Sequence, residues 1–183
     1  MDFEEKTLKS EMIYDGKVTK YVVEDVLLPN GKRSKREIVR HAGASAVIAF
    51  TDDNRLLLVK QYRKAIEQIS IEIPAGLKDA EDTDGMTTAK RELEEETGYQ
   101  AKEWSFVTSF YSTPGFTDEF LEIYEAKQLM TVENPLPKDE DETIELLALT
   151  FDEAWAEYEK GYLRDSKSVF ALFYWKMNRI QNK

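Results

Sequence analysis

The segment KRELEEETGYQ, residues 90–100, places closely spaced glutamates on a stretch with helical periodicity. At about 100° per residue, the side chains of Glu92, Glu95 and Glu96 fall within an arc of about 100°, whereas Glu94 points away from them. Like charges three or four residues apart destabilise an exposed helix by about 0.2–0.5 kcal/mol per pair. Mg²⁺ or Mn²⁺ would reverse this repulsion, because hard divalent cations prefer carboxylate and carbonyl oxygens. The spacing therefore predicts a divalent-metal site.

The apolar positions of the same helix place these carboxylates at the border of its buried side. Met86, Ala89 and Leu93 form a stripe beside the acidic arc. The alternative is a solvated helical face partly neutralised by Lys90 and Arg91, which needs no metal.

The composition narrows the chemistry further. The chain of 183 residues has no cysteine and a single histidine, so thiolate and histidine-cluster metal sites are excluded. Its net charge of −11 argues against a nucleic-acid partner. No apolar run approaches the roughly 20 residues that cross a bilayer, and the first residues lack the layout of a signal peptide. We expect a cytoplasmic protein with no membrane or nucleic-acid partner, in which a cation mediates contact with any anionic ligand.

The elements that position the acidic helix follow from alternation and turn residues. Short strands fill the first two thirds of the chain and helices concentrate later, which predicts an α+β domain with helices packed on a mixed sheet. Residues 20–41 predict an antiparallel hairpin around a Pro-Asn-Gly turn. The acidic helix is expected from about Thr87 to Thr97, ended by Gly98. A further helix is expected after a capping box at Thr150. The last helix is expected from apolar residues that recur at helical spacing to the end of the chain: Val169, Phe170, Phe173, Met177 and Ile180.

Residues 76–99, GLKDAEDTDGMTTAKRELEEETGY, resemble the Nudix box. That pattern is Gly, five residues of any kind, Glu, seven of any kind, Arg-Glu, an apolar residue, any, Glu-Glu, any, Gly and an apolar residue. The positions in register are Arg91, Glu92, Leu93, Glu95, Glu96, Gly98 and Tyr99. Counted back from Arg91, the early Glu falls at Thr83 and the first Gly at Leu77. The loop therefore carries one extra residue, with Glu81 or Asp82 in place of the early Glu.

The resemblance implies a fold and a division of the chain. The expected fold is a mixed β-sheet sandwiched by helices in α/β/α layers, with an N-terminal antiparallel β-hairpin appendage. Residues 1–42 are then a dimerisation segment, and residues 43–183 the Nudix hydrolase domain.

The resemblance also implies roles for the acidic residues. Glu92, Glu96, Glu142 and the backbone carbonyl of Ala75 would bind Mg²⁺, for which Mn²⁺ can substitute, while Glu95 assists or orients. In relatives that cleave ADP-ribose the general base can lie in an acidic loop outside the box, and alignment with EDETIEL assigns that role to Glu140. The alternative is that this loop is only solvated and mobile.

Flanking segments resemble the subfamily that cleaves ADP-ribose and related ADP-sugars. Pro114 stands sixteen residues after Gly98 within STPGFTDE, as in that subfamily. The resemblance implies substrate contacts at Thr113, Gly115 and Glu119, around Pro114, and at Leu77. It also implies that Arg36 and Glu37 contact the adenosine part, often across a dimer. Arg63 would contact the diphosphate. The alternatives are a Pro-Gly turn without a ligand, an edge-strand charge at Arg36 and a solvated strand end at Arg63.

These residues together predict Mg²⁺-dependent hydrolysis of the diphosphate bond of ADP-ribose and related ADP-sugars, which releases AMP and ribose 5-phosphate. The expected assembly is a homodimer. One alternative is a Nudix pyrophosphatase acting on another nucleoside diphosphate derivative or on a nucleoside triphosphate. The others are a non-catalytic ADP-ribose sensor and a purely structural acidic protein.

Overall fold

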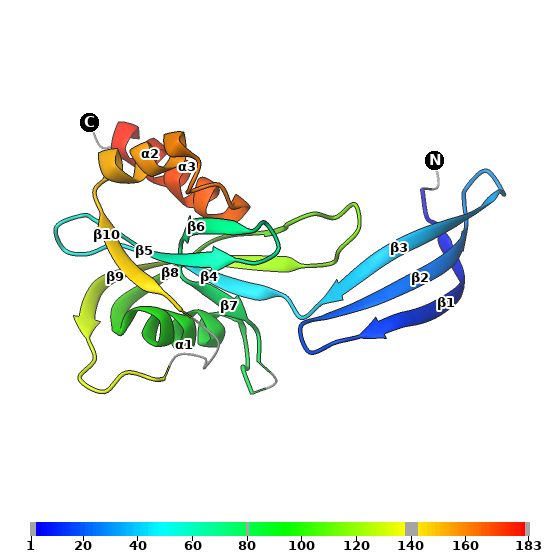
Figure 1. Cartoon of the computed structure of the whole chain (residues 1–183), viewed down its shortest axis with the longest axis horizontal. Coiled ribbons are helices and arrows are strands. Elements are labelled where there is room, and N and C mark those ends of the chain that lie inside the picture. Colours follow the sequence, from blue (N-terminus) through cyan, green and yellow to red (C-terminus); the bar gives the residue numbers. More distant parts are fainter. Residues whose placement is uncertain (1–2, 80, 138–142, 182–183) are drawn as a thin grey trace. The chain divides into compact units, whose positions relative to one another are not determined.

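The computed structural model describes residues 3–79, 81–137 and 143–181 (Figure 1). The chain divides into two compact units. The smaller unit comprises Met1–Gly43 and Phe110–Leu121, and the larger unit comprises Ala44–Ser109 and Glu122–Lys183.

The smaller unit is built on a three-stranded antiparallel sheet in the order β1-β2-β3. Its strands are β1 (Lys6–Asp15), β2 (Thr19–Leu27) and β3 (Arg33–His41). The predicted hairpin is confirmed as β2 and β3, and Gly31 in their turn has a φ of 78°, a conformation that favours glycine. The sequence prediction missed β1. Every residue of β1 is exposed, so it lacks the half-buried alternation that marks a strand in a sequence.

The segment Phe110–Leu121 belongs to the smaller unit because it is bonded to β3. The backbone N–H of Val39 donates to the carbonyl of Phe116 at 2.8 Å, and Val39 also forms a bridge with Thr117. The loop that contains the Pro-Gly turn is therefore attached to the strand that carries Arg36 and Glu37.

The larger unit is an α/β/α sandwich, which confirms the predicted fold class (Figure 1). One sheet has the order β7-β4-β9-β8 and the other the order β10-β5-β6. Helix α1 lies on one side of these strands, and α2 and α3 lie on the other. The strands are β4 (Ala44–Ala49), β5 (Leu56–Arg63), β6 (Gln68–Glu72), β7 (Ala75–Leu77), β8 (Tyr99–Tyr111), β9 (Phe120–Thr131) and β10 (Glu145–Leu149), and the helices are α1 (Gly85–Thr97), α2 (Phe151–Lys160) and α3 (Ser166–Gln181).

Helix α1 is held in place by its caps and its apolar stripe. The Asp84 side chain accepts from the Thr87 N–H at the amino end, and Gly98, with a φ of 73°, caps the carboxyl end as predicted. Ala89 and Leu93 are fully buried in a cluster with residues of β4, β5 and β9. The predicted apolar stripe is therefore the packed side of this helix.

The later helices also follow their predictions, with one difference. The capping box at Thr150 and Glu153 starts α2. In α3 the apolar residues that revealed the helix, such as Phe173, Met177 and Ile180, are exposed, whereas Ala171, Leu172 and Trp175 are buried. Helical spacing identified the helix but not the face that the sheet covers. No helix in the described part of the chain has the length and apolarity needed to cross a membrane.

Candidate functional site

Two glutamates of α1 are buried against the strand that precedes the box loop. Glu96 is 2% exposed, and its Oε2 accepts from the backbone N–H of Ala75 at 3.0 Å. Glu92 is 9% exposed, and its carboxylate lies directly over Gly76. A Cβ at position 76 would lie 2.0 Å from Glu92 Oε1, so only glycine leaves room for this carboxylate. Three positions expected to bind metal, Ala75, Glu92 and Glu96, thus lie together.

Arg91 links these carboxylates to the loop before α1. Its Nη1 donates to Glu92 Oε1 at 2.7 Å and to Glu95 Oε2 at 2.8 Å. Its Nη2 donates to the carbonyl of Leu77 at 2.9 Å and to Asp82 Oδ2 at 3.0 Å. A guanidinium fork held at this many points fixes the orientation of the glutamates that it contacts.

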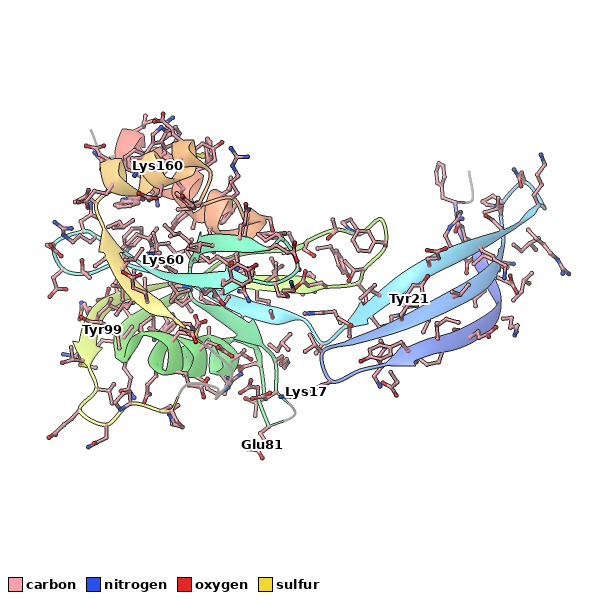
Figure 2. All side chains as sticks on the ribbon, viewed as in Figure 1. Lys17, Tyr21, Lys60, Glu81, Tyr99 and Lys160 are labelled. Atoms are coloured by element: carbon pink, nitrogen blue, oxygen red, sulfur yellow. The ribbon has the colours of Figure 1, made fainter. Side chains whose placement is uncertain are left out.

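Of the two acids that the box pattern left open, Asp82 is the one that contacts Arg91. Its side chain is 6% exposed and also accepts from the Thr88 hydroxyl and the Asp79 N–H. Burial opposes ionisation of Asp82, but the bond from Arg91 and these other donors lower its pKa below the usual value. Glu81 is exposed on the loop, with its side chain pointing away from the fold (Figure 2).

The donors around Glu92 and Glu96 fit a hard divalent cation. Two nearly buried carboxylates one helical turn apart, beside a strand backbone, supply only oxygen ligands, which Mg²⁺ and Mn²⁺ prefer. Within the described residues no three acidic or histidine side chains form a complete metal-binding group. Glu140 and Glu142, expected as base and ligand, lie outside the described residues.

Arg63, expected to contact the diphosphate, forms a bidentate pair with the buried Glu72. Its Nε and Nη2 donate to the two carboxylate oxygens at 2.8 Å each, and Lys167 Nζ lies 2.6 Å from Glu72 Oε2. Burial alone would raise the pKa of Glu72, but the bonds and charges of Arg63 and Lys167 lower it to about 2. Two donor nitrogens of Arg63 are therefore already engaged within the larger unit.

The smaller unit contains a cavity of about 430 Å³ that collects the predicted adenosine contacts. Arg36 and Glu37 come from β3, and Gly115 comes from the Pro-Gly loop. Glu119 lies at the end of this loop, where the Ser112 hydroxyl donates to it and His41 Nε2 lies 3.7 Å from its Oε1. Thr113 accepts, through its carbonyl, from the N–H groups of Phe116 and Thr117, and so shapes the loop turn.

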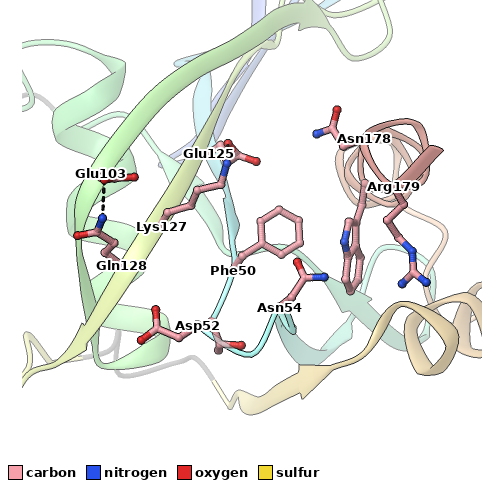
Figure 3. A pocket seen from close by; sticks show the side chains of 11 residues that line it. Phe50, Asp52, Asn54, Glu103, Glu125, Lys127, Gln128, Asn178 and Arg179 are labelled. Atoms are coloured by element: carbon pink, nitrogen blue, oxygen red, sulfur yellow. Dashed lines mark hydrogen bonds and ion pairs between the residues drawn. The ribbon is translucent and has the colours of Figure 1, made fainter. Parts of the chain in front are cut away.

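A larger cavity, of about 570 Å³, lies in the larger unit and contains none of the predicted residues (Figure 3). Lys127 and Glu125 lie together on β9, and Asn178 and Arg179 project from α3. No residue of α1 lines this cavity. This cavity is therefore separate from the glutamate site, which is formed by Glu92 and Glu96 beside Ala75.

The structure adds site residues that sequence reasoning missed. Glu5 lines the smaller cavity and pairs with Arg36, although the two are 31 positions apart. Glu72 engages Arg63 and is itself paired with Lys167 from α3. A charge-pairing search could not select Glu5 or Glu72, because the chain has 36 acidic residues and only the fold decides which are neighbours.

Comparisons with known proteins agree with this geometry. The NUDIX domain model matches residues 39–172. "Methanol dehydrogenase activator" of Bacillus methanolicus is 51% identical over 94% of this chain and 92% of its own length. "ADP-ribose pyrophosphatase" of Bacillus subtilis is 47% identical over 93% of this chain and 92% of its own length. A crystal structure of an "ADP compounds hydrolase" shares the fold, with a TM-score of 0.81 and 23% identity over 94% of this chain and 93% of that one.

Proposed function

The chain belongs to the NUDIX domain family, and from this premise we propose that it hydrolyses the diphosphate bond of ADP-ribose and related ADP-sugars to AMP and ribose 5-phosphate. The observation that carries this proposal is the pair of buried carboxylates, Glu92 and Glu96, against Ala75 and Gly76. The 47% identity to an ADP-ribose pyrophosphatase over most of both chains supports the substrate.

The glutamate site assigns roles to the residues of the larger unit. Glu92, Glu96 and the Ala75 carbonyl, with Glu142, would hold Mg²⁺, and Mn²⁺ would substitute. The cation, when bound, supplies neutralisation of the diphosphate and activation of a water. Glu95 would be oriented by Arg91, and Glu140 would accept the proton of the attacking water. Arg63, already paired with Glu72, would place a positive charge near the phosphoryl oxygens.

The cavity of the smaller unit would bind the adenosine part of the substrate. Arg36, Glu37 and Gly115 line it, with Thr113 and Glu119 in the same loop. Leu77, on β7, stays a predicted substrate contact of the larger unit by itself. We propose a homodimer that pairs through the N-terminal strands, since the ten residues of β1 are all exposed and such an edge strand is open to pairing. Sedimentation analysis giving a monomer mass would contradict the dimer.

The assay is incubation of the purified chain with ADP-ribose and Mg²⁺, followed by chromatography of the products. We expect AMP and ribose 5-phosphate in equal amounts. Addition of EDTA should abolish product formation, and excess Mg²⁺ should restore it, because the acidic site works through the cation. Absence of AMP from wild-type protein would reject the substrate, and a panel of GDP-sugars, dinucleoside polyphosphates and nucleoside triphosphates would then identify the compound cleaved.

A second candidate function is suggested by the relative named methanol dehydrogenase activator, which is 51% identical to this chain. The test is to add the purified chain to a methanol dehydrogenase and to measure the rate of methanol oxidation. A rate increase that a Glu96→Gln variant also produces would indicate activation by binding alone. A rate increase that this variant loses would indicate activation through hydrolysis.

A further inference from the structure

Arg36 is held in the cavity of the smaller unit by an acid from the segment ahead of β1. Its Nε donates to Glu5 Oε2 at 2.7 Å, and its Nη2 donates to Glu5 Oε1. Its Nη1 donates to the Ser34 hydroxyl at 3.0 Å and to the Lys35 carbonyl at 2.9 Å. A guanidinium carries five N–H groups in one plane. Four of these donors are therefore engaged within the unit.

This arrangement determines which part of Arg36 a ligand can use. A phosphate that bound the donor edge would have to displace the Glu5 carboxylate, which is itself an anion in bidentate geometry. The two flat faces of a guanidinium remain available when its edge is occupied, and they stack well on planar aromatic rings. The Arg36 side chain is 40% exposed, so a ring in the cavity can reach it.

The charges around the cavity also favour an uncharged planar group. Its lining includes three acidic side chains, Glu5, Glu37 and Asp118, and two basic ones, Arg36 and Arg40. Arg40 is itself paired with Asp118 at 3.1 Å. Three negative charges against two positive charges repel a diphosphate, whereas a nucleobase carries no charge to be repelled. Tyr111 and Phe116 add aromatic surface to the same lining.

We infer that Glu5 is a positioning residue of a nucleobase subsite: it occupies the donor edge of Arg36 and so presents the face of the guanidinium to the base. This inference rests on the proposed function for the identity of the substrate. It goes further in stating how Arg36 acts and in assigning a role to Glu5, 31 residues earlier in the chain.

The test is steady-state kinetics with ADP-ribose on Glu5→Ala, Arg36→Ala and Arg36→Lys variants. We expect Glu5→Ala to raise KM by about 3- to 10-fold with kcat nearly unchanged, because only binding of the base is weakened. Arg36→Lys should raise KM as much as Arg36→Ala, since a lysine keeps the charge but has no planar face. Inhibition by AMP should weaken in each variant, while inhibition by ribose 5-phosphate should stay unchanged.

The control is Asp53→Asn, which removes an exposed carboxylate of the larger unit that pairs with Arg55. It should leave KM unchanged. The KM of the Glu5→Ala/Arg36→Ala double variant should equal the KM of Arg36→Ala alone, because Glu5 acts through Arg36. An unchanged KM in Glu5→Ala, additive effects in the double variant, or a wild-type KM in Arg36→Lys would overturn the inference.

Two further measurements cover the cases in which a variant does not fold or the wild-type protein does not cleave ADP-ribose. Thermal unfolding of each variant reports its folding, and Glu5→Gln, which keeps one acceptor, replaces Glu5→Ala if the latter does not fold. If wild-type protein releases no AMP from ADP-ribose, the proposed function fails. Calorimetric titration with AMP then tests the inference separately, with a weaker Kd in the Glu5 variant supporting it and an equal Kd overturning it.

Discussion

Identical side chains on α1 have different surroundings, and these surroundings separate their roles. Glu92 and Glu96 are nearly buried beside Ala75 and Gly76. Glu94 instead faces the other side of the helix, where its carboxylate accepts from the Gln100 side chain at 2.7 Å and from the Leu136 N–H at 3.2 Å. The helical arc drawn from the sequence distinguished the same two groups.

Glu96→Gln should abolish most of the activity. The amide keeps the shape of the side chain but lacks the negative charge that would hold the cation, so we expect kcat for ADP-ribose to fall roughly 100- to 1000-fold. Glu94→Gln is the matched control on the same helix and should retain kcat within about twofold. Equal losses in both variants, measured by AMP release, would contradict the assignment.

Asp82 illustrates how one residue can replace another when a loop changes length. The Nudix pattern has a glutamate in the loop before the helix. In this chain that loop carries one extra residue, and its acid near Arg91 is an aspartate, Asp82. The fold still brings a carboxylate to Arg91, at 3.0 Å. A loop can absorb an insertion, whereas the helix positions after it are in fixed register.

At the scale of elements, two glycines fix where α1 lies and where it ends. Gly76 of β7 allows the Glu92 carboxylate to approach the strand backbone. Gly98 ends the helix in the left-handed region at a φ of 73°, and its N–H donates to the carbonyl of Glu94. The first glycine is required by close approach, and the second by backbone conformation.

These two glycines should therefore respond differently to alanine. In Gly76→Ala the new methyl group meets the end of a flexible side chain, so the Glu92 carboxylate should move, activity should fall at least tenfold, and Tm should change little. In Gly98→Ala the positive φ should cost about 1–2 kcal/mol of stability, with kcat preserved.

The measurements are AMP release and thermal unfolding on both variants. A Gly76→Ala protein with full activity would show that the Glu92 carboxylate need not lie over the strand.

At the scale of the whole molecule, a buried ion network joins distant elements of the larger unit. Glu72 on β6 is 2% exposed and pairs with Arg63 on β5 and Lys167 on α3. Asp165 pairs with Lys167 at 3.1 Å, and the Ser168 hydroxyl donates to Asp165. Removing one member of such a network leaves buried charge without its partner, which is costly.

Glu72→Gln should lower the free energy of unfolding by about 3 kcal/mol at pH 7. The pKa of Glu72 is about 2 in the folded protein against an ordinary value of 4.5, so its contribution is complete above pH 4.5 and is lost as pH falls towards 2. The stability difference between wild type and variant should therefore shrink across this window. Urea unfolding at several pH values measures it.

Glu145→Gln is the control for this experiment. Its carboxylate is 61% exposed and pairs with Lys60 at 2.8 Å, and an exposed pair contributes only about 0–1 kcal/mol. A difference between wild type and Glu72→Gln that stays constant down to pH 2 would show that lost packing, and not ionisation, explains the effect.

The sequence by itself determined the local features of this protein. The period of the apolar residues and the capping residues at Gly98 and Thr150 predicted α1 and α2, and the box spacing predicted which glutamates share a face. Such features depend on residues within a few turns or positions of one another, so they can be read along the chain. The exposed strand β1 escaped prediction, because a strand without a buried face has no alternation.

Only the tertiary structure decided the contacts between distant segments. It paired Glu5 with Arg36, selected Asp82 over Glu81 for Arg91, and placed Glu72 between Arg63 and Lys167. The physical reason is that, by side-chain chemistry alone, any of the 25 basic residues can pair with any of the 36 acidic residues. Which of them meet is decided by strand register, by loop length and by the packing of α3 on the sheet.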